Sequence, residues 1–229
     1  MNTLFWDMAT SSTFLKPLGM FRKRIALTNS FHTDLMVSAG NGAFLHPYSQ
    51  YPHTIIDNHE KLMECSDGLA IASVMTKRQQ LTYPKTSNDL YKKDLLYMSV
   101  CLDSLGWKKI FLDTRFINPT TVSFHCFNQK TRYDVAHDIY RDLVSRSKHN
   151  SNGEAIVTSR ELKDLFGSQK YPYIALYPVG HPLAVGLSRS PISAALTWQG
   201  RSLSNFEASE FVKEVFSFDQ IHDNGTNVV

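Results

Sequence analysis

The clearest hydrophobic pattern in the chain lies in residues 88–105 and predicts an amphipathic helix. Apolar residues recur there at the three- and four-residue spacing of one helical face, at Tyr91, Leu95, Met98, Leu102 and Leu105. Ser87 stands where an N-terminal cap is expected, and Gly106 stands where a glycine ends many helices. Residues 107–112 follow as a short, mostly apolar strand.

A second pattern, in residues 20–37, predicts a buried strand that runs into an acidic loop. Ile25 to Leu27 are apolar, the three polar residues that follow break the run, and Asp34 comes shortly after them. A carboxylate just beyond the carboxyl end of a strand occupies the place where open α/β sheets position functional residues. A surface turn that happens to contain an aspartate is the alternative interpretation.

Other patterns predict helices at residues 3–18 and 38–45, a strand at 53–56 and an extended stretch at 120–127. A strand, a helix and a further strand in this order are typical of a βαβ unit, so we expect parallel pairing. Residues 57–86 mix charged residues with a short apolar piece, and we interpret them as an insertion or a flexible crossover.

The C-terminal part of the chain shows a different pattern of predicted elements. Residues 138–144 predict the start of a helix, and Thr158 to Phe166 predict a short capped helix. Ser204 and Glu207 form a capping box that opens a further helix. The domain boundaries that we expect are a domain at residues 1–145, a polar and turn-rich linker at 146–157, an extension at 158–218 and a disordered tail at 219–229.

Composition narrows the class of protein. The chain has 229 residues, of which 42% are hydrophobic, so it can form a sizeable core. A net charge of +3, with acids and bases interspersed, does not indicate a nucleic-acid surface. No apolar run reaches the ~20 residues of a membrane span. Three widely spaced cysteines and no signal-peptide pattern favour an intracellular, cytoplasmic protein, with peripheral association with a membrane or lipid droplet left open.

Asp34 and His137 are the candidate catalytic residues, because each follows a predicted strand and the acid precedes the histidine. The triad of an α/β-hydrolase runs serine, then acid, then histidine along the chain. The acid orients the imidazole, which takes the proton from the serine. Chance is the alternative explanation, since a chain with 9 histidines and 21 acidic residues supplies such pairs easily.

Two segments around these residues resemble the putative serine esterase family, which consists of lipase-like α/β-hydrolases of eukaryotes. The first runs from Phe5-Trp-Asp-Met-Ala-Thr10 through Phe14-Leu-Lys-Pro-Leu-Gly-Met-Phe-Arg-Lys-Arg-Ile25 to Asn29 and Asp34. The second comprises Leu105-Gly-Trp-Lys-Lys-Ile-Phe-Leu112 and the run from Asn128 to the Ala-His pair at His137. The resemblance covers residues 4–144 and implies a partial α/β-hydrolase fold, with Asp34 as acid, His137 as base and a lipid or acyl ester as substrate. It implies no cofactor.

The chain departs from this family in one decisive respect, because it contains no Gly-x-Ser-x-Gly turn. Gly186-Leu-Ser188-Arg-Ser190 lacks the closing glycine and follows the histidine in the chain. The nucleophile and the oxyanion-hole loop of the family are expected upstream of Met1, so the chain matches only the C-terminal half of such a hydrolase. Without a nucleophile, Asp34 and His137 cannot form an acyl-enzyme.

A non-catalytic α/β interaction module is therefore the alternative function. Half of a parallel sheet leaves an open edge strand, which favours pairing with a partner or with a second copy. His59 and Glu60 do not predict a metal site, because no second histidine follows at metal-ligand spacing, and solvated loop residues are the simpler interpretation. His32 lies near Asp34 and is most simply a local hydrogen-bonding residue.

Overall fold

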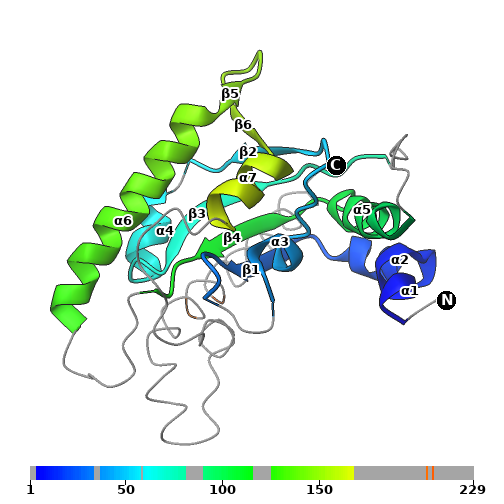
Figure 1. The fold of residues 1–229 in the computed structure, drawn as a ribbon, viewed down its shortest axis with the longest axis horizontal. Helices are drawn as coiled ribbons and strands as arrows, with labels where there is room; N and C mark the ends of the chain where they lie inside the picture. The colour runs from blue at the N-terminus through cyan, green and yellow to red at the C-terminus, as the bar shows by residue number, and fades with distance from the viewer. Residues whose placement is uncertain are drawn as a thin grey trace, which may run out of the picture.

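The computed structural model describes residues 4–33, 37–57, 59–80, 90–115 and 125–167, together with Asn205 and Ala208. These residues form a mixed α/β fold around one six-stranded sheet (Figure 1). The strands are β1 (Ile25–Asn29), β2 (Pro52–Ile55), β3 (Ala70–Met75), β4 (Lys108–Leu112), β5 (Lys148–His149) and β6 (Ala155–Thr158). The helices are α1 (Leu4–Thr10), α2 (Ser12–Met20), α3 (Ala39–Gly42), α4 (His59–Cys65), α5 (Leu90–Asp103), α6 (His125–Arg146) and α7 (Ser159–Phe166).

The sheet is mostly antiparallel, with the strand order β1-β4-β3-β2-β6-β5. Only β1 and β4 are parallel among the described strands. The α/β class predicted from the sequence is confirmed, but the mostly parallel sheet is corrected. The reason lies in the connection through α5. Thr76 directly follows β3 and Trp107 directly precedes β4, and the amide of Thr76 donates to the carbonyl of Trp107. The chain therefore enters β4 at the same end of the sheet at which it left β3. A helix inserted in this way joins adjacent antiparallel strands, whereas a βαβ crossover would have produced a parallel pair.

Residues 57–86 are not an insertion, because they supply α4 and β3, which is a central strand of the sheet. Five of the six residues of β3 are buried. A strand that is covered on both faces reads as a short continuous apolar run without alternation. The run from Ala70 to Val74 has that character, but its alanines and serine made the signal weak.

Residues 146–157, expected to be a linker, contain the hairpin β5–β6, and β6 pairs with β2. Asn150 shapes the turn, because its side-chain oxygen accepts hydrogen bonds from the amides of Asn152 and Glu154. Its polar, turn-rich composition therefore reflects a tight hairpin turn. The capped helix predicted at Thr158 is confirmed as α7, with a capping box between Thr158 and Glu161. Phe166 of α7 is fully buried against Phe111 of β4.

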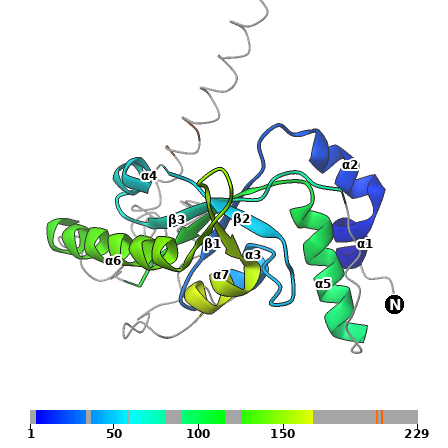
Figure 2. The ribbon, with the colours of Figure 1, turned by 90° about the horizontal axis from the view of Figure 1, so that it is seen from above.

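Helices cover both faces of the sheet. The larger apolar cluster packs side chains of α3, α6 and α7 against one face, and a smaller cluster packs Leu62 of α4 against Ala70, Ile110 and Leu112 on the other. Figure 2 shows this layering from above. Helix α6 begins at His125, so residues 125–127, expected to be extended, are helical. Residues 120–124 of that predicted stretch, the capping-box residues Ser204 and Glu207, and the predicted tail lie outside the described residues.

Helices α1, α2 and α5 pack together beyond one end of the sheet, and we call them the helical layer (Figure 2). The helix predicted at residues 3–18 is divided into α1 and α2, and the side chain of Ser11 caps α2. The buried face of α5 is rotated from the predicted stripe. Leu96, Val100 and Cys101 are buried, whereas Leu95 is 40% exposed. Gly106, in the short segment that joins α5 to β4, has a positive φ of 78°, as its helix-ending position predicted.

Candidate functional site

The predicted catalytic acid follows the turn at the carboxyl end of β1. Ser30 continues the strand, because its amide donates to the carbonyl of Leu112 on β4. Phe31 and His32 then adopt left-handed backbone conformations, with φ values of 57° and 55°. Two consecutive non-glycine residues in this region mark a tightly constrained turn. Asp34 itself lies outside the described residues, so its catalytic role stays a prediction.

The carboxyl ends of β1 and β4 meet at a buried ion pair that the sequence analysis missed. Asp113 follows β4 directly, and Arg115 donates to both of its carboxylate oxygens, at 2.8 and 2.5 Å. The Arg115 guanidinium also lies 3.7 Å from the ring centroid of Phe31. This pair fixes the β1 turn against the end of β4. Because the Asp113 carboxylate is already engaged in a bidentate pair, it does not offer a free base for catalysis.

His137, the predicted catalytic base, lies at an exposed position within α6 and not directly after a strand, because this helix already begins at His125. Its Nδ1 accepts a hydrogen bond of 2.7 Å from Nη2 of Arg141, one helical turn further along. An arginine can only donate, so Nδ1 carries no proton in this arrangement. A triad histidine uses one ring nitrogen to donate to the acid, and here that donor would have to be Nε2.

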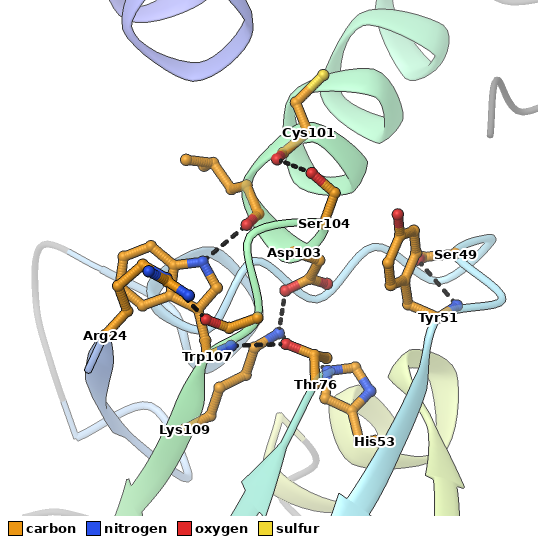
Figure 3. Close-up of polar contacts among 12 residues, drawn as sticks. Arg24, Ser49, Tyr51, His53, Thr76, Cys101, Asp103, Ser104, Trp107 and Lys109 are labelled. Carbon is orange, nitrogen blue, oxygen red and sulfur yellow. Dashed lines mark hydrogen bonds and ion pairs between the residues drawn. The ribbon is translucent and has the colours of Figure 1, made fainter. Parts of the chain in front are cut away.

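The cluster of described residues with the strongest electrostatic perturbation lies elsewhere, at the amino end of β4 (Figure 3). Lys109 of β4, Asp103 at the end of α5 and His53 of β2 each have 0% solvent exposure. Nζ of Lys109 donates to Oδ1 of Asp103 and lies 2.9 Å from Nε2 of His53. The centroid of the Phe44 ring lies 5.7 Å from the same Nζ atom. We call Asp103, Lys109 and His53 the buried triplet.

Local backbone structure explains why a lysine is buried here. Side chains alternate between faces along a strand, so Lys109 shares the face of Phe111, while Lys108 shares the face of Ile110. The Lys109 side chain reaches up toward the end of α5, where Asp103 reaches down to meet it (Figure 3). The sequence did not single out Lys109, because Lys108 and Lys109 are adjacent and side chains on both faces of β4 are buried.

Burial shifts the pKa values of the buried triplet. Desolvation raises the pKa of Asp103 to about 6, with the opposing attraction of Lys109 as the smaller effect. Desolvation also lowers the pKa of Lys109, although Asp103 favours its charged form. The pKa of His53 falls well below its usual value, first because of burial and then because of Lys109. A neutral His53 can therefore accept a hydrogen bond at Nε2 from the Lys109 ammonium.

Perturbed titratable groups in contact are often functional, but these groups have no solvent-exposed surface. A substrate could not reach Lys109 or Asp103 without movement of α5. The neighbouring Cys101 is also buried, and burial raises the pKa of its thiol. A thiol in this state is a weak nucleophile. The buried triplet is therefore a connection between the helical layer and the sheet, not an open active site.

No protein-family model, curated protein or solved structure matches this chain. The resemblance to serine esterases and the domain division drawn from it therefore stay predictions. Among the described residues, no group of three or more His, Cys, Asp and Glu side chains could hold a metal ion. No helix in the part of the chain that the structure describes is both long and apolar enough to cross a bilayer.

His59 corrects a second expectation. It begins α4 and is buried, whereas the sequence suggested a solvated loop residue. Its Nε2 lies 3.1 Å from the carbonyl oxygen of Ile71, and its ring stacks on Tyr140 of α6 at 4.1 Å. Burial lowers its pKa, which favours the neutral ring. A neutral Nε2–H that donates to the Ile71 carbonyl gives His59 a structural role between α4, β3 and α6.

Proposed function

We propose that this chain is a non-catalytic α/β module that associates with a second copy of itself through the outer surface of α1 and α2. The observation that carries the proposal is an accumulation of exposed apolar side chains. Six of the ten large hydrophobic residues that are exposed in the described part of the chain lie in residues 4–21. They are Leu4, Phe5, Met8, Phe14, Met20 and Phe21. We call them the association surface.

The size of the association surface supports this interpretation. Phe5 is 75% exposed, Phe21 is 64% exposed and Met20 is 83% exposed. A fully buried aromatic side chain removes about 150–250 Å² from water. Six large apolar side chains therefore supply a substantial part of the ~800 Å² that each partner buries in a standard interface. Single exposed apolar residues need no explanation, but a concentration of them marks an interaction site.

The neighbouring strand favours a second copy as the occupant. Phe21 leads through three basic residues into β1, which pairs on one side only, with β4, among the described strands. An edge strand and an adjoining apolar surface are present in every copy of the chain. Two copies related by a two-fold axis can therefore bury the same surface on both sides, which is the commonest form of homo-oligomer.

Self-association is testable by sedimentation velocity across the micromolar concentration range. We expect the wild type to dimerise, and we expect the double variant Phe5→Asp, Phe21→Asp to dissociate at least tenfold more readily, because two charges would be buried in an apolar interface. Tenfold corresponds to about 1.4 kcal/mol. Tyr48→Asp is the matched control, because Tyr48 is 61% exposed but lies outside the association surface. A wild type that stays monomeric at every concentration contradicts the proposal.

A second candidate function is that of a lipase-like serine ester hydrolase acting on a lipid or acyl ester, with Asp34 and His137 as acid and base. One observation favours it. Strands β1 and β4 are parallel, and Asp34 follows the carboxyl end of β1 by five residues. This is the position at which open α/β sheets place functional residues. The sheet that continues antiparallel beyond β4 does not favour it.

A fluorophosphonate probe, which labels activated serines, separates the two candidates. We expect no labelling of the wild type, because the chain has no serine in a nucleophile turn. Labelling that is abolished by His137→Ala, and retained in His149→Ala, would instead identify an active serine hydrolase. In that case Ser188→Ala is the next variant, since Ser188 lies in the segment that most nearly matches Gly-x-Ser-x-Gly.

A further inference from the structure

The helical layer has apolar clusters of its own, separate from those of the sheet. One contains Leu15, Cys101 and Leu105, and the other packs Leu96 and Val100 of α5 against Tyr51, from the loop before β2. Among the residues whose side chains the structure describes, the large cluster on the sheet contains none from α1, α2 or α5. Trp6 of α1 stacks on Tyr97 of α5, so the three helices hold together as a unit. The helical layer and the sheet are therefore not joined by one continuous hydrophobic core.

Apart from the contact with Tyr51, polar contacts join the two, as Figure 3 shows. Lys109 of the sheet binds Asp103 of α5. Arg24, just before β1, donates to the carbonyl oxygens of Leu105 and Gly106 at the end of α5. The indole Nε1 of Trp107 donates to the carbonyl of Leu102 at 2.7 Å. Hydrogen bonds of this kind have discrete geometries, so the joint is either made or broken.

The buried triplet and its surroundings also contain groups that water would stabilise. Oδ2 of Asp103 and the hydroxyl of Tyr51 are buried and have no hydrogen-bond partner among the described residues. A buried polar group without a hydrogen-bond partner destabilises the state in which it is buried. Water would reach both groups if α5 moved away from the sheet, and this gain offsets part of the lost contacts. The free-energy difference that keeps α5 packed against the sheet is therefore smaller than the ion pair alone would suggest.

We propose that the buried triplet is a proton-sensitive joint, at which the helical layer separates from the sheet as a unit when His53 takes up a proton. The charged and titratable groups that face the joint are Lys109 from β4, Asp103 and Cys101 from α5, and Tyr51 from the loop before β2. A second positive charge on His53, 2.9 Å from the Lys109 ammonium, cannot be accommodated at 0% exposure.

The direction of the pH dependence follows from the three pKa shifts. The pKa of His53 is depressed in the closed state, so its contribution to closure is present above its ordinary value of 6.5 and is lost as the pH falls. The raised pKa of Asp103, about 6, works in the opposite direction, because closure gains from its protonation as the pH falls through 6. The lowered pKa of Lys109 works in the same direction as that of His53, because closure gains as the pH rises toward the range in which Lys109 loses its proton. Opening should therefore increase between about pH 8 and 6 and level off below.

A cysteine at position 100 reports on the joint, because Val100 of α5 is buried against Tyr51 of the loop before β2 and becomes accessible when α5 leaves the sheet. The experiment uses the full chain with Val100→Cys and with Cys65→Ser, Cys101→Ala and Cys126→Ser, so that N-ethylmaleimide can react with position 100 alone. At each pH the alkylation rate is divided by the rate for the urea-unfolded chain, which removes the intrinsic pH dependence of the thiolate. Dilute protein keeps the measurement independent of self-association.

We expect the corrected alkylation rate to rise about two- to fourfold from pH 8 to pH 6. The rise should be lost in His53→Gln and kept in His149→Gln, since His149 is exposed on β5. Hydrogen exchange of the wild type provides a second measurement that needs no variant. Amides of α1 and α5 should exchange together, at a lower opening free energy than those of β3 and β4. A flat corrected rate, a rise that persists in His53→Gln, or equal opening free energies for helices and strands would each overturn the proposal.

The joint extends the proposed function in one respect, which rests on that function being correct. The association surface belongs to α1 and α2, so it moves with α5 when the joint opens. Because the proposed interface combines this surface with the edge of β1, separation of the two would weaken self-association between about pH 8 and 6. Failure of the sedimentation experiment alone would remove this link and leave the joint itself intact, because alkylation at position 100 is measured on the monomer.

Discussion

Replacing Asp103 with alanine is expected to lower the free energy of unfolding by about 3–5 kcal/mol. The substitution leaves the Lys109 ammonium without its counter-charge at a site with 0% exposure. Urea unfolding followed by circular dichroism, with linear extrapolation to water, measures the loss. Lys77→Ala is the matched control, because it breaks the exposed pair between Lys77 and Glu154. An exposed pair contributes only about 0–1 kcal/mol.

The double variant Asp103→Leu, Lys109→Met distinguishes the charge effect from simple loss of packing. It removes both charges and keeps apolar volume, so its stability should lie close to that of the wild type or above it. A double variant that is less stable than Asp103→Ala would contradict the electrostatic explanation. In that case the side chains would contribute mainly through the shape of the cavity that they fill.

Replacing Phe166 with alanine is expected to cost about 3–5 kcal/mol, because a fully buried aromatic side chain leaves a cavity. Phe166 stacks on Phe111 of β4 at a centroid distance of 4.1 Å and also contacts Phe31 in the turn after β1. The loss should appear as a shift of one cooperative urea transition. Arg160→Ala, at an exposed position of the same helix, should change the stability little.

The same experiment decides how the chain is divided into domains. A separate extension beginning at residue 158 would lose its own transition in Phe166→Ala and leave that of the sheet in place. A single transition followed by both fluorescence and circular dichroism would place α7 in the core of the sheet. The packing of α7 against β4 supports the single transition.

The sequence predicted local structure well where one or two residues determine it. Gly106 marked the end of the α5 connection, and Thr158 with Glu161 marked the start of α7, because a positive φ and a capping box each depend on side chains close in sequence. Strand β1 was predicted because its apolar run is short and sharply bounded. These features need no knowledge of the rest of the chain.

Pairing and burial were harder to predict, because they depend on residues far apart. The direction of β4 relative to β3 is set by where the chain returns after α5, which no local pattern encodes. Polar residues 146–157 were assigned to a linker, although their asparagines form a hairpin turn. The burial of Lys109 required both the strand alternation and the position of Asp103 at the end of α5. Neither residue stands out in a chain with 20% charged residues.

The parallel pairing of β1 with β4 has a consequence for how the protein is made. Arg24 and Gly106, which meet at the start of these strands, are 82 residues apart in the chain. A ribosome adds about 5–20 residues per second, so β1 emerges roughly 4–16 s before the strand that it pairs with. During that interval its backbone hydrogen-bonding groups and the apolar side chains of α1 and α2 are unprotected. Synthesis with a chaperone that binds apolar segments should therefore increase the yield of folded chain.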